Sequence, residues 1–433
     1  MNDEIISKEN VLKELFSKQR FGIKPGLERT LSLCESAGNP QNKFKSVHVA
    51  GTNGKGSVCS AIASIMMESG YKTGLYTSPH LVDFNERIRI NQNMINDEQL
   101  VELYLRIRNK SDEIGATFFE ITTVMAFIYF AENNVDIAII ETGMGGRFDS
   151  TNVLSPLLSI ITKIDSDHNE YLGDTIQKIA YEKAGIIKQN TPCIISQNTD
   201  EVYKVIESNS LENKIIYAEK QIDLFRIGKE KSIVSKWHIK LDDSIIEFEY
   251  PIPGSHQKDN LAAVIVAIKE LKHHFEISDE NIIKGIKNVR HNAGLYARIE
   301  VLREEPLLIL DGSHNSGSIE NLFDTLSEAY PGKKWNMIFA VMADKNIDDV
   351  FQYIIKYADS AVIPQLKIDR ALNCVTLAEE ISNRGFENVI STQSVNEALI
   401  INEKKDNILI LGSFYLAGEV LEIWHNKNLN FVN

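Results

Sequence analysis

A glycine-rich loop between an apolar strand and a helix constrains this chain more than any other segment. Residues 44–50 are predicted to form a β-strand, and a helical pattern runs from the loop to about Met67. The loop between them reads Gly51, Thr52, Asn53, Gly54, Lys55, Gly56 and Ser57. Glycine lets backbone N–H groups converge on phosphate oxygens, and the helix N-terminus adds its positive dipole end. The segment therefore predicts an α/β fold with a nucleotide phosphate site.

The polar side chains of this loop have distinct expected roles. Lys55 is placed to reach the terminal phosphates, and the Ser57 hydroxyl to contact phosphate or magnesium. The spacing departs from a strict Walker A motif, because the first glycine stands one residue closer and Gly56 separates Lys55 from Ser57. The alternative is a tight βα turn without a ligand. The strand before the loop and the helix after it favour the phosphate site.

Short β-rich runs alternate with helical patterns along much of the chain, which indicates βαβ units and a mostly parallel sheet. Further strands are predicted at 71–77, 135–141 and 157–164, and helices at 97–114, 120–132 and 256–271. The runs 135–141 and 157–164 are largely apolar and of strand length, as expected for central parallel strands covered on both faces. Between 212 and 250, charged residues interrupt short alternating runs, so we expect antiparallel hairpins outside the main sheet.

The α/β pattern restarts in the last third of the chain. Strands are predicted at 306–310, 335–341 and 408–411, and a helix at 318–329. The segment 289–295 is the candidate linker, since it contains Asn292 and Gly294. A chain of 433 residues exceeds a typical single domain. We therefore expect a P-loop-type domain at 1–293 and a smaller, Rossmann-like α/β domain at 294–433.

Charge and composition exclude several functions. The net charge of −14 argues against a general nucleic-acid binder, although a local cluster of basic residues and metal can still hold an anionic substrate. We see no signal peptide and no apolar run of membrane-spanning length. The cysteines are scattered and form no CxxC pair: they are Cys34, Cys59, Cys193 and Cys374. A cytoplasmic protein without a membrane or nucleic-acid partner is expected.

Glu141 ends the apolar run 135–140 and is followed by glycines at 143, 145 and 146. Carboxyl ends of parallel strands are where α/β sheets open their ligand crevice. Magnesium in nucleotide sites takes one or two carboxylates with phosphates and water, so Glu141 is a candidate metal ligand. The alternative is a carboxylate that caps a helix or faces solvent. The glycines favour the ligand, because they let the backbone approach it closely.

His168 and Lys183 gain interest only beside the phosphate loop. His168 follows the apolar run 157–164, and read alone it is a structural or surface histidine. Lys183 lies in a helical pattern that Gly185 is expected to cap, and read alone it is a solvated charge. In the second domain, Asp311 follows another apolar strand. It is placed to accept hydrogen bonds from ribose hydroxyls or, equally well, to start an Asx-type turn.

Together these segments resemble the folylpolyglutamate and dihydrofolate synthase family, a branch of the Mur-type amide ligases. The matching segments follow the family's order along nearly the whole chain: 26–29, 48–57, 77–81, 85–88, 141–152, 167–168, 182–187, 256–257 with 260, 298–300, 311–315, and 342 with 344–345. The resemblance implies ATP-dependent ligation of L-glutamate to a folate, with dihydropteroate as a further candidate acceptor. It also implies an acyl-phosphate intermediate, release of ADP and phosphate, and two magnesium ions.

The resemblance also assigns roles to individual residues. Metal ligands would be Ser57, Ser78, Glu141, His168 and a carbamylated Lys183, and the catalytic set would be Lys55, Glu141, His168 and Lys183. ATP would contact loop 51–57 together with Asn260, Arg298, Asp311 and His314 from both sides of an interdomain cleft. The pterin would lie near Gly26, Leu27, Glu28, Arg29, Thr122, Phe148, Asp149 and Ser150. A monomer is the expectation from the family.

The chain also departs from the family pattern. Tyr296 and Ala297 replace the usual Pro-Gly before Arg298, and Ser316 stands where proline is common. Lys163 and Ser166 are unusual just before residues 167–168. Lys163 and Ser166 keep one alternative open: a Mur-type ligase for another carboxylate, such as a cell-wall precursor. The second alternative, from a different class, is a P-loop ATP-binding protein without ligase turnover. The P-loop alternative does not explain why Glu141, His168 and Lys183 occur together.

Overall fold

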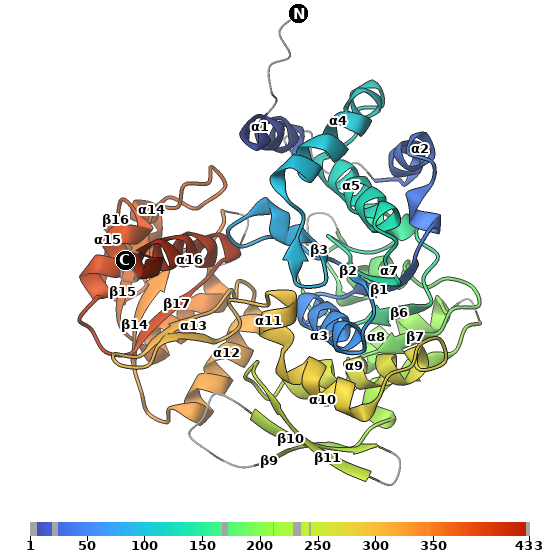
Figure 1. The fold of residues 1–433 in the computed structure, drawn as a ribbon. Helices are drawn as coiled ribbons and strands as arrows, with labels where there is room; N and C mark the ends of the chain where they lie inside the picture. The colour runs from blue at the N-terminus through green and yellow to red at the C-terminus, as the bar shows by residue number, and fades with distance from the viewer. Residues whose placement is uncertain are drawn as a thin grey trace, which may run out of the picture.

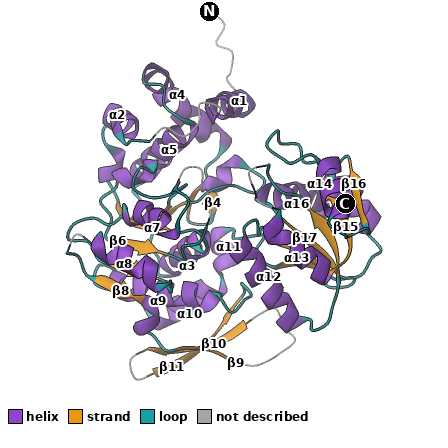
Figure 2. Ribbon diagram, turned by 180° about the vertical axis from the view of Figure 1, so that it is seen from behind, coloured by secondary structure: helices purple, strands orange, loops and turns teal. Residues whose placement is uncertain are grey.

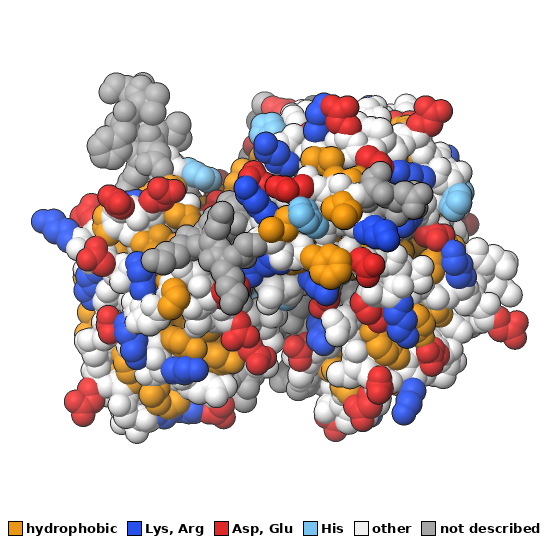
Figure 3. Space-filling model, turned by 90° about the horizontal axis from the view of Figure 1, so that it is seen from below, with side chains coloured by type: hydrophobic (Ala, Val, Ile, Leu, Met, Phe, Trp, Pro, Cys, Tyr) orange, Lys and Arg blue, Asp and Glu red, His pale blue; other side chains and the backbone are white. Residues whose placement is uncertain are grey.

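A computed structural model describes residues 7–19, 25–166, 172–210, 212–227, 235–241, 244–343, 345 and 347–429. Two α/β units lie side by side, and a small three-stranded sheet lies beneath them in the view of Figure 1. No helix in the described part of the chain is long and apolar enough to cross a membrane. On the face that Figure 3 shows, acidic and basic side chains are interspersed rather than gathered into one large patch.

The first unit is built on an eight-stranded sheet. Its spatial order is β4 (Asn93–Met94), β3 (Ile88–Ile90), β2 (Thr73–Tyr76), β5 (Ile137–Glu141), β1 (Lys45–Ala50), β6 (Leu158–Ile161), β7 (Cys193–Ile195) and β8 (Ile215–Tyr217). Six neighbouring strands run parallel to one another, in the order β2, β5, β1, β6, β7 and β8. At the β2 edge, β3 pairs antiparallel to β2, and β4 pairs antiparallel to β3. The predicted mostly parallel α/β sheet is confirmed. Because β1 lies between β5 and β6, the loop after β1 opens between the ends of both neighbours.

Helices cover both faces of this sheet. The helices of this unit are α1 (Lys8–Gln19), α2 (Glu28–Ser36), α3 (Lys55–Glu68), α4 (Asp97–Glu113), α5 (Phe118–Glu132), α7 (Ile176–Ala184), α8 (Asp200–Ser208), α9 (Gln257–Leu271), α10 (Asp279–Lys287) and α11 (Val289–Ala293), with short 3-10 turns at Pro40–Asn42, Phe84–Arg87, Ser150–Val153 and Ala218–Lys220. Ile137 and Ile139 pack with α3 and α9, whereas Ala138 and Ile140 pack with α5. Alternate side chains of a strand face opposite sides, which explains why β5 is apolar throughout.

The segment between β7 and α9 divides between two sheets. Strands β9 (Leu224–Ile227), β10 (Ser235–Leu241) and β11 (Ser244–Tyr250) form the predicted antiparallel insertion. The prediction was wrong for β8, which pairs parallel to β7 and extends the main sheet. Its short apolar run, with Ile216 buried, completes the sheet edge beside Ile194. Local alternation did not distinguish an edge strand of the main sheet from a hairpin strand.

The second unit has a six-stranded sheet. Its spatial order is β12 (Glu300–Arg303), β13 (Leu308–Leu310), β17 (Ile408–Leu411), β14 (Trp335–Phe339), β15 (Ala358–Pro364) and β16 (Val389–Thr392). All pairings are parallel except that of β12 with β13. The helices are α12 (Ser316–Ala329), α13 (Asp348–Tyr357), α14 (Cys374–Asn383), α15 (Val395–Asn402) and α16 (Phe414–Leu429). They pack on both faces of the sheet, as Figure 2 shows from behind.

The predicted linker 289–295 is largely helical, which corrects the sequence interpretation. Helix α11 occupies Val289–Ala293 and ends at Gly294, whose φ of +64° is favourable for glycine. Asn292, buried in this helix, donates from Nδ2 to Ser64 Oγ at 3.0 Å and to Glu68 Oε1 at 2.8 Å. These contacts attach the segment to the end of α3. Asparagine and glycine together suggested a linker, and tertiary hydrogen bonds hold a short helix there.

Candidate active site

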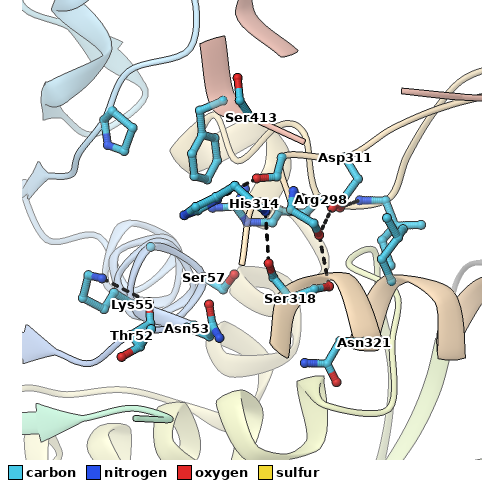
Figure 4. A pocket seen from close by; sticks show the side chains of 18 of the residues that line it. Thr52, Asn53, Lys55, Ser57, Arg298, Asp311, His314, Ser318, Asn321 and Ser413 are labelled. Atoms are coloured by element: carbon cyan, nitrogen blue, oxygen red, sulfur yellow. Dashed lines mark hydrogen bonds between the residues drawn. The ribbon is translucent and has the colours of Figure 1, made fainter. Parts of the chain in front are cut away.

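A cleft between the two units brings the predicted polar segments together (Figure 4). The first unit contributes residues 52–57, Ser78, Glu141 and Asn260 to its lining. The second contributes Arg298, Asp311, His314, Ser318 and Phe414. Apart from Arg298, which precedes the antiparallel strand β12, these residues follow or end parallel strands or lie in the first turns of helices. The two sheets therefore direct their ligand-binding edges toward one common space.

At two positions of the phosphate loop, Gly51 and Gly54, the backbone leaves no space for a side chain. Gly51 has a φ of +151°, and a Cβ built there would lie 1.8 Å from Thr162 Oγ1. Gly54 has a φ of +92° and precedes α3, and a Cβ there would lie 2.3 Å from Asn260 Oδ1. Both glycines are therefore required by conformation and by close approach. The first turn of α3 opens into the cleft, where its N–H groups can bind an anion.

Two lysines converge on the carbonyl of Gly51. Lys55 Nζ donates to Gly51 O at 3.1 Å and to Thr52 O at 3.2 Å. Lys183 Nζ, from α7, donates to Gly51 O at 2.7 Å, although its side chain was expected to be solvated if read alone. Lys183 is only 4% exposed. Of the two lysines, Lys55 lines the cleft, where its ammonium group can contact an anionic ligand, whereas Lys183 lies behind the loop.

Glu141 lies beside the phosphate loop because β5 pairs with β1 in register Val49 to Glu141. The residue is 4% exposed, and Oε2 accepts a hydrogen bond from the Ser78 N–H at 3.1 Å. Burial raises the pKa of the carboxyl, while Lys55 and the Ser78 N–H oppose the rise. A Cβ at Gly56 would lie 3.7 Å from Oε2, so the carboxylate stands close against the start of α3. A buried carboxylate with one backbone donor retains capacity to bind a cation.

The oxygen donors near Glu141 fit a magnesium ion. Ser57 and Ser78 line the same cleft as the carboxylate, and magnesium prefers such oxygen ligands with phosphates and waters completing its shell. No cluster of three His, Cys, Asp or Glu side chains that could hold a metal occurs in the described part of the chain. The predicted ligand His168 lies outside the described residues.

The second unit presents Arg298, Asp311 and His314 to the cleft. The Arg298 guanidinium lies 4.7 Å from the centre of the Phe414 ring, and burial lowers the Arg298 pKa, opposed by Asp311 and Glu141. Asp311 Oδ2 accepts from the Ile299 N–H at 2.7 Å, and Oδ1 accepts from the Ser313 N–H at 2.8 Å and from its hydroxyl. The Asx-type turn that was one of two interpretations of Asp311 is present. The bonds to Asp311 hold the backbone around the cleft in place.

An asparagine pair joins the two units at the phosphate loop. Asn53 Nδ2 donates to Asn315 Oδ1 at 3.4 Å, and Asn315 Nδ2 donates to Asn53 Oδ1 at 3.2 Å. Asn315 also caps α12, since its Oδ1 accepts from the Ser318 N–H at 3.0 Å. The phosphate loop is therefore tied directly to the first turn of a helix in the other unit. Movement of one unit relative to the other breaks this pair.

Several departures from the family pattern have visible structural consequences. Ala297 and Ile299, on either side of Arg298, have φ angles of +52° and +44°, in the left-handed region that favours glycine. Both are buried. Ser316 is the first residue of α12, a position where proline is well tolerated. The backbone that presents Arg298 is thus strained on both sides.

Lys163 supports the phosphate loop through its backbone. Its carbonyl accepts from the Thr52 N–H at 2.8 Å and from the Asn53 N–H at 3.1 Å. Its exposed side chain interacts electrostatically with Asp259 of α9. Burial raises the pKa of Asp259, and the positive charge of Lys163 opposes that rise. Ser166 donates its N–H to Asp165 Oδ1 at 2.9 Å.

The residues assigned to a pterin by resemblance lie outside the lining of this cleft. Arg29 forms a salt bridge with the buried Glu120 at 2.9 Å, which fixes the start of α2 against α5. Thr122 is fully buried and lies 3.2 Å from the Tyr76 hydroxyl. Their role with a ligand stays a prediction, as does that of residues 26–28.

The loop after Glu141 contains a buried and an exposed part. Asp149 Oδ2 accepts from the Met144 N–H at 2.8 Å, and Oδ1 accepts from the Thr151 N–H at 3.0 Å. Ser150 is also buried, whereas Phe148 is 50% exposed.

Gly185 ends α7 as predicted, but with a φ of −61°, so the left-handed cap is absent. Its missing side chain serves close packing instead, because a Cβ there would lie 2.4 Å from Arg147 Cα.

Sequence interpretation missed some of the cleft lining. Ser318, Asn321, Arg370, Ser413 and Phe414 all line it without having been singled out. Ser413 and Phe414 could have been found, because they follow the apolar strand β17, and Glu141 was found at the corresponding end of β5. Asn321 lies on a helix face with no such signal. Its approach to the cleft depends on how the two units are placed.

Comparisons with known proteins agree with this architecture. The family model described as "Mur ligase middle domain" matches residues 49–268, and that described as "Mur ligase, glutamate ligase domain" matches residues 297–414. The dihydrofolate synthase/folylpolyglutamate synthase of Bacillus subtilis is 34% identical over 423 residues, covering 94% of this chain and 96% of that protein. Similarity therefore extends over both units.

Solved structures support the same conclusion. The folylpolyglutamate synthase of Thermotoga maritima superposes with a TM-score of 0.84 at 31% identity, covering 97% of each chain. The folylpolyglutamate synthase of Mycobacterium tuberculosis, complexed with ADP and AMPPCP, superposes with a TM-score of 0.86 at 28% identity, covering 98% of this chain and 99% of that one. These matches place the cleft in a fold for which nucleotide complexes are known.

Proposed function

The chain belongs to the folylpolyglutamate and dihydrofolate synthase family of Mur-type ligases, and from this membership we propose how its cleft works. The protein is an ATP-dependent C–N ligase that joins L-glutamate to a folate. The observation that carries the proposed site is the convergence of loop 51–57 with buried Glu141 in a cleft lined by both units. Dihydropteroate is a second proposed acceptor.

The proposed reaction has two steps. The folate carboxylate attacks the γ-phosphorus of ATP, which forms an acyl phosphate and releases ADP. The neutral glutamate amino nitrogen then attacks the acyl carbon, and the tetrahedral intermediate expels inorganic phosphate as the nitrogen gives up one proton and keeps the other as the amide N–H. Lys55 and the α3 N-terminus orient and neutralise the phosphates. Arg298 and His314 hold the nucleotide from the other unit, so that closure excludes water from the acyl phosphate.

We propose that Ser57, Ser78 and Glu141 hold magnesium together with the nucleotide phosphates, and that His168 joins them at a second ion. When bound, magnesium neutralises charge between the reacting phosphate and carboxylate. The buried Glu141 carboxylate supports this role, because its charge is costly unless a cation offsets it. Ser78 orients the carboxylate through its backbone N–H.

Lys183 is proposed to react with carbon dioxide and become a carbamate. Its nitrogen forms a bond to the carbon of CO₂ and releases protons, which turns a donor into a carboxylate-like acceptor near the cation site. Its burial and its position 2.7 Å from the Gly51 carbonyl support a role at the loop. A carbonyl carbon signal from ¹³C-bicarbonate, lost in Lys183→Ala, tests the modification. A wild-type enzyme without that signal contradicts it.

The remaining assignments are also proposals. Residues 26–29, Thr122 and Phe148–Ser150 are proposed to lie near the pterin, with half-exposed Phe148 available for ring stacking. We propose a division into a Mur-ligase-like ATPase and pterin-binding domain at 1–293 and a ligase domain at 294–433. The enzyme is proposed to act as a monomer in the cytoplasm, without a membrane or nucleic-acid partner.

One assay tests the proposed function directly. ADP release is measured with ATP, magnesium and L-glutamate, in the presence of dihydropteroate, of a tetrahydrofolate, or of no acceptor. We expect release above the blank with at least the tetrahydrofolate, and a product heavier by one glutamate residue. Release that neither pterin stimulates would contradict folate ligation and favour another carboxylate substrate or simple ATP binding.

A further inference from the structure

The start of α9 carries three side chains that bond to one another along the cleft. His256, Gln257 and Asn260 all contribute to its lining. Asn260 Nδ2 donates to Gln257 Oε1 at 2.9 Å, and Gln257 Nε2 lies 2.9 Å from His256 Nε2. Gln257, in the middle, is 2% exposed. The three groups therefore form a continuous chain of hydrogen bonds, in which Gln257 and Asn260 are buried.

The orientation of the amides sets the direction of this chain. An amide nitrogen only donates and an amide oxygen only accepts. With Gln257 oriented as in the structure, its Nε2 donates and His256 Nε2 accepts, whereas turning both amides over would make His256 Nε2 the donor. In the orientation of the structure, the proton of the neutral imidazole must lie on Nδ1. Burial and the nearby Arg298 guanidinium lower the His256 pKa to about 4, which keeps the ring neutral near pH 7. Nδ1 is buried and has no hydrogen-bond partner among the described residues.

The other end of the chain meets the phosphate loop. With Nδ2 bonded to Gln257, Asn260 turns Oδ1 toward Gly54, where a Cβ would lie only 2.3 Å away. An asparagine amide is nearly symmetric in shape, so packing alone does not distinguish its oxygen from its nitrogen. The chain of bonds makes that distinction through its last member, because an unprotonated His256 Nε2 requires the Gln257 nitrogen beside it and hence the Gln257 oxygen beside Asn260 Nδ2. It presents an acceptor oxygen at the loop in the absence of any ligand.

We propose that Gln257 and His256 are positioning residues that fix the orientation of the Asn260 amide for the nucleotide. This inference rests on the proposed function, in which Asn260 contacts ATP. An amide that is already oriented need not lose rotational freedom when ATP binds, so the gain is in nucleotide affinity. The arrangement has an energetic cost, because His256 Nδ1 is buried without a hydrogen-bond partner among the described residues. Gln257 touches no reacting atom in this scheme.

Two substitutions and one control test the inference. Gln257→Leu removes both hydrogen bonds. Gln257→Glu still accepts from Asn260 but cannot donate to His256, so it moves the imidazole proton to Nε2 or protonates the ring. The control is Asp259→Asn on the same turn, since Asp259 interacts with Lys163 and lies outside the cleft lining. The readouts are KM for ATP, KM for the folate, kcat, and ¹⁵N NMR of the histidine side chains, with His256 assigned from His256→Asn.

We expect the neutral Nδ1–H tautomer for His256 in the wild type and a protonated Nε2 in Gln257→Glu. Gln257→Leu should raise KM for ATP roughly tenfold, the size expected for a lost buried hydrogen bond, with kcat and the folate KM within about twofold. Asp259→Asn should leave all three constants unchanged. A wild-type Nε2–H tautomer overturns the inference, as does an unchanged KM for ATP in Gln257→Leu. An enzyme that binds no ATP at all overturns the proposed function as well.

Discussion

The two sides of the cleft each hold a buried carboxylate, but they bond it differently. Asp311 has hydrogen bonds to both oxygens, from the Ile299 N–H and from Ser313. Glu141 accepts one hydrogen bond within the described residues, from the Ser78 N–H, although burial raises the pKa of both carboxyls. Asp311 is thus used to hold backbone, whereas Glu141 keeps unfilled acceptor capacity. The comparison indicates that the carboxylate of the first unit is available to bind a cation, whereas the carboxylate of the second unit fixes the backbone that lines the cleft.

The sharpest way to break this comparison is Glu141→Gln. We expect kcat/KM to fall by about 10²–10³, because the amide cannot hold a cation or offset its charge. Stability at pH 7 should not fall. The folded pKa of Glu141 lies above its unfolded value, so the charged form already weakens the fold above that pKa, and the substitution removes this cost. Steady-state kinetics and thermal unfolding measure the two effects.

The raised pKa also predicts a pH dependence for the wild type. Glu141 loses its charge as pH falls through a pKa above the ordinary carboxylate range, so kcat/KM should decline there. Glu68→Gln serves as the control, since Glu68 bonds to Asn288 and Asn292 at the far end of α3. It should lose stability and keep its activity. A Glu141→Gln variant that retains activity would remove the carboxylate from the reaction.

Lys183→Ala tests the other buried group on this side. We expect near-complete loss of turnover, on the order of 10²-fold or more, with the fold intact. The lost hydrogen bond to the Gly51 carbonyl should lower stability only slightly, since Lys55 still donates to that oxygen. Activity and circular dichroism check the two statements. Retained turnover would rule out a metal or carbamate role for Lys183.

Asp311→Asn is the counterpart of Glu141→Gln on the second side. The amide nitrogen would face a backbone N–H donor, so we expect a loss of about 2 kcal/mol in the free energy of unfolding. KM for ATP should rise several-fold, with a smaller change in kcat. Denaturant unfolding and substrate titration measure these effects. Loss of kcat without loss of stability would reverse the proposed division of labour.

Asn315→Ala probes the contact between the two sides. The variant loses the α12 cap and the pair with Asn53, so it should be destabilised by about 1 kcal/mol and bind ATP more weakly. Ser278→Ala is the matched control, because Ser278 caps α10 in the same way but lies away from the cleft. It should lose similar stability without a change in KM for ATP. Equal KM values in both variants would show that the pair does not assist nucleotide binding.

The smallest expected effect is that of Ala297→Gly. Ala297 has a φ of +52°, where glycine is unstrained, so the substitution should stabilise the fold by up to about 1 kcal/mol. Ala293→Gly, at the end of α11, is the control and should be destabilising, because helical backbone there favours alanine. Urea midpoints measure both. A destabilised Ala297→Gly would show that the left-handed angle carries no strain.

The sequence was most informative where a strand leads directly into a functional loop. The segment from β1 through the glycine loop to α3, and Glu141 at the end of β5, were predicted because periodicity and glycine spacing are local properties. The assignments of β8 and of the helical linker α11 failed for the converse reason. Pairing partners decided both, and a single short window does not contain them.

The sequence by itself determined the phosphate loop, the mostly parallel α/β architecture and the polar residues at strand ends. Tertiary structure alone decided which of those residues meet. It placed β5 beside β1, so that Glu141 faces the loop, and it brought Asn315 to Asn53 across 262 positions of sequence. It also decided that both oxygens of Asp311 accept backbone N–H groups, whereas Glu141 accepts one, from Ser78. Strand order and domain placement arise from long-range packing, which local residue patterns do not encode.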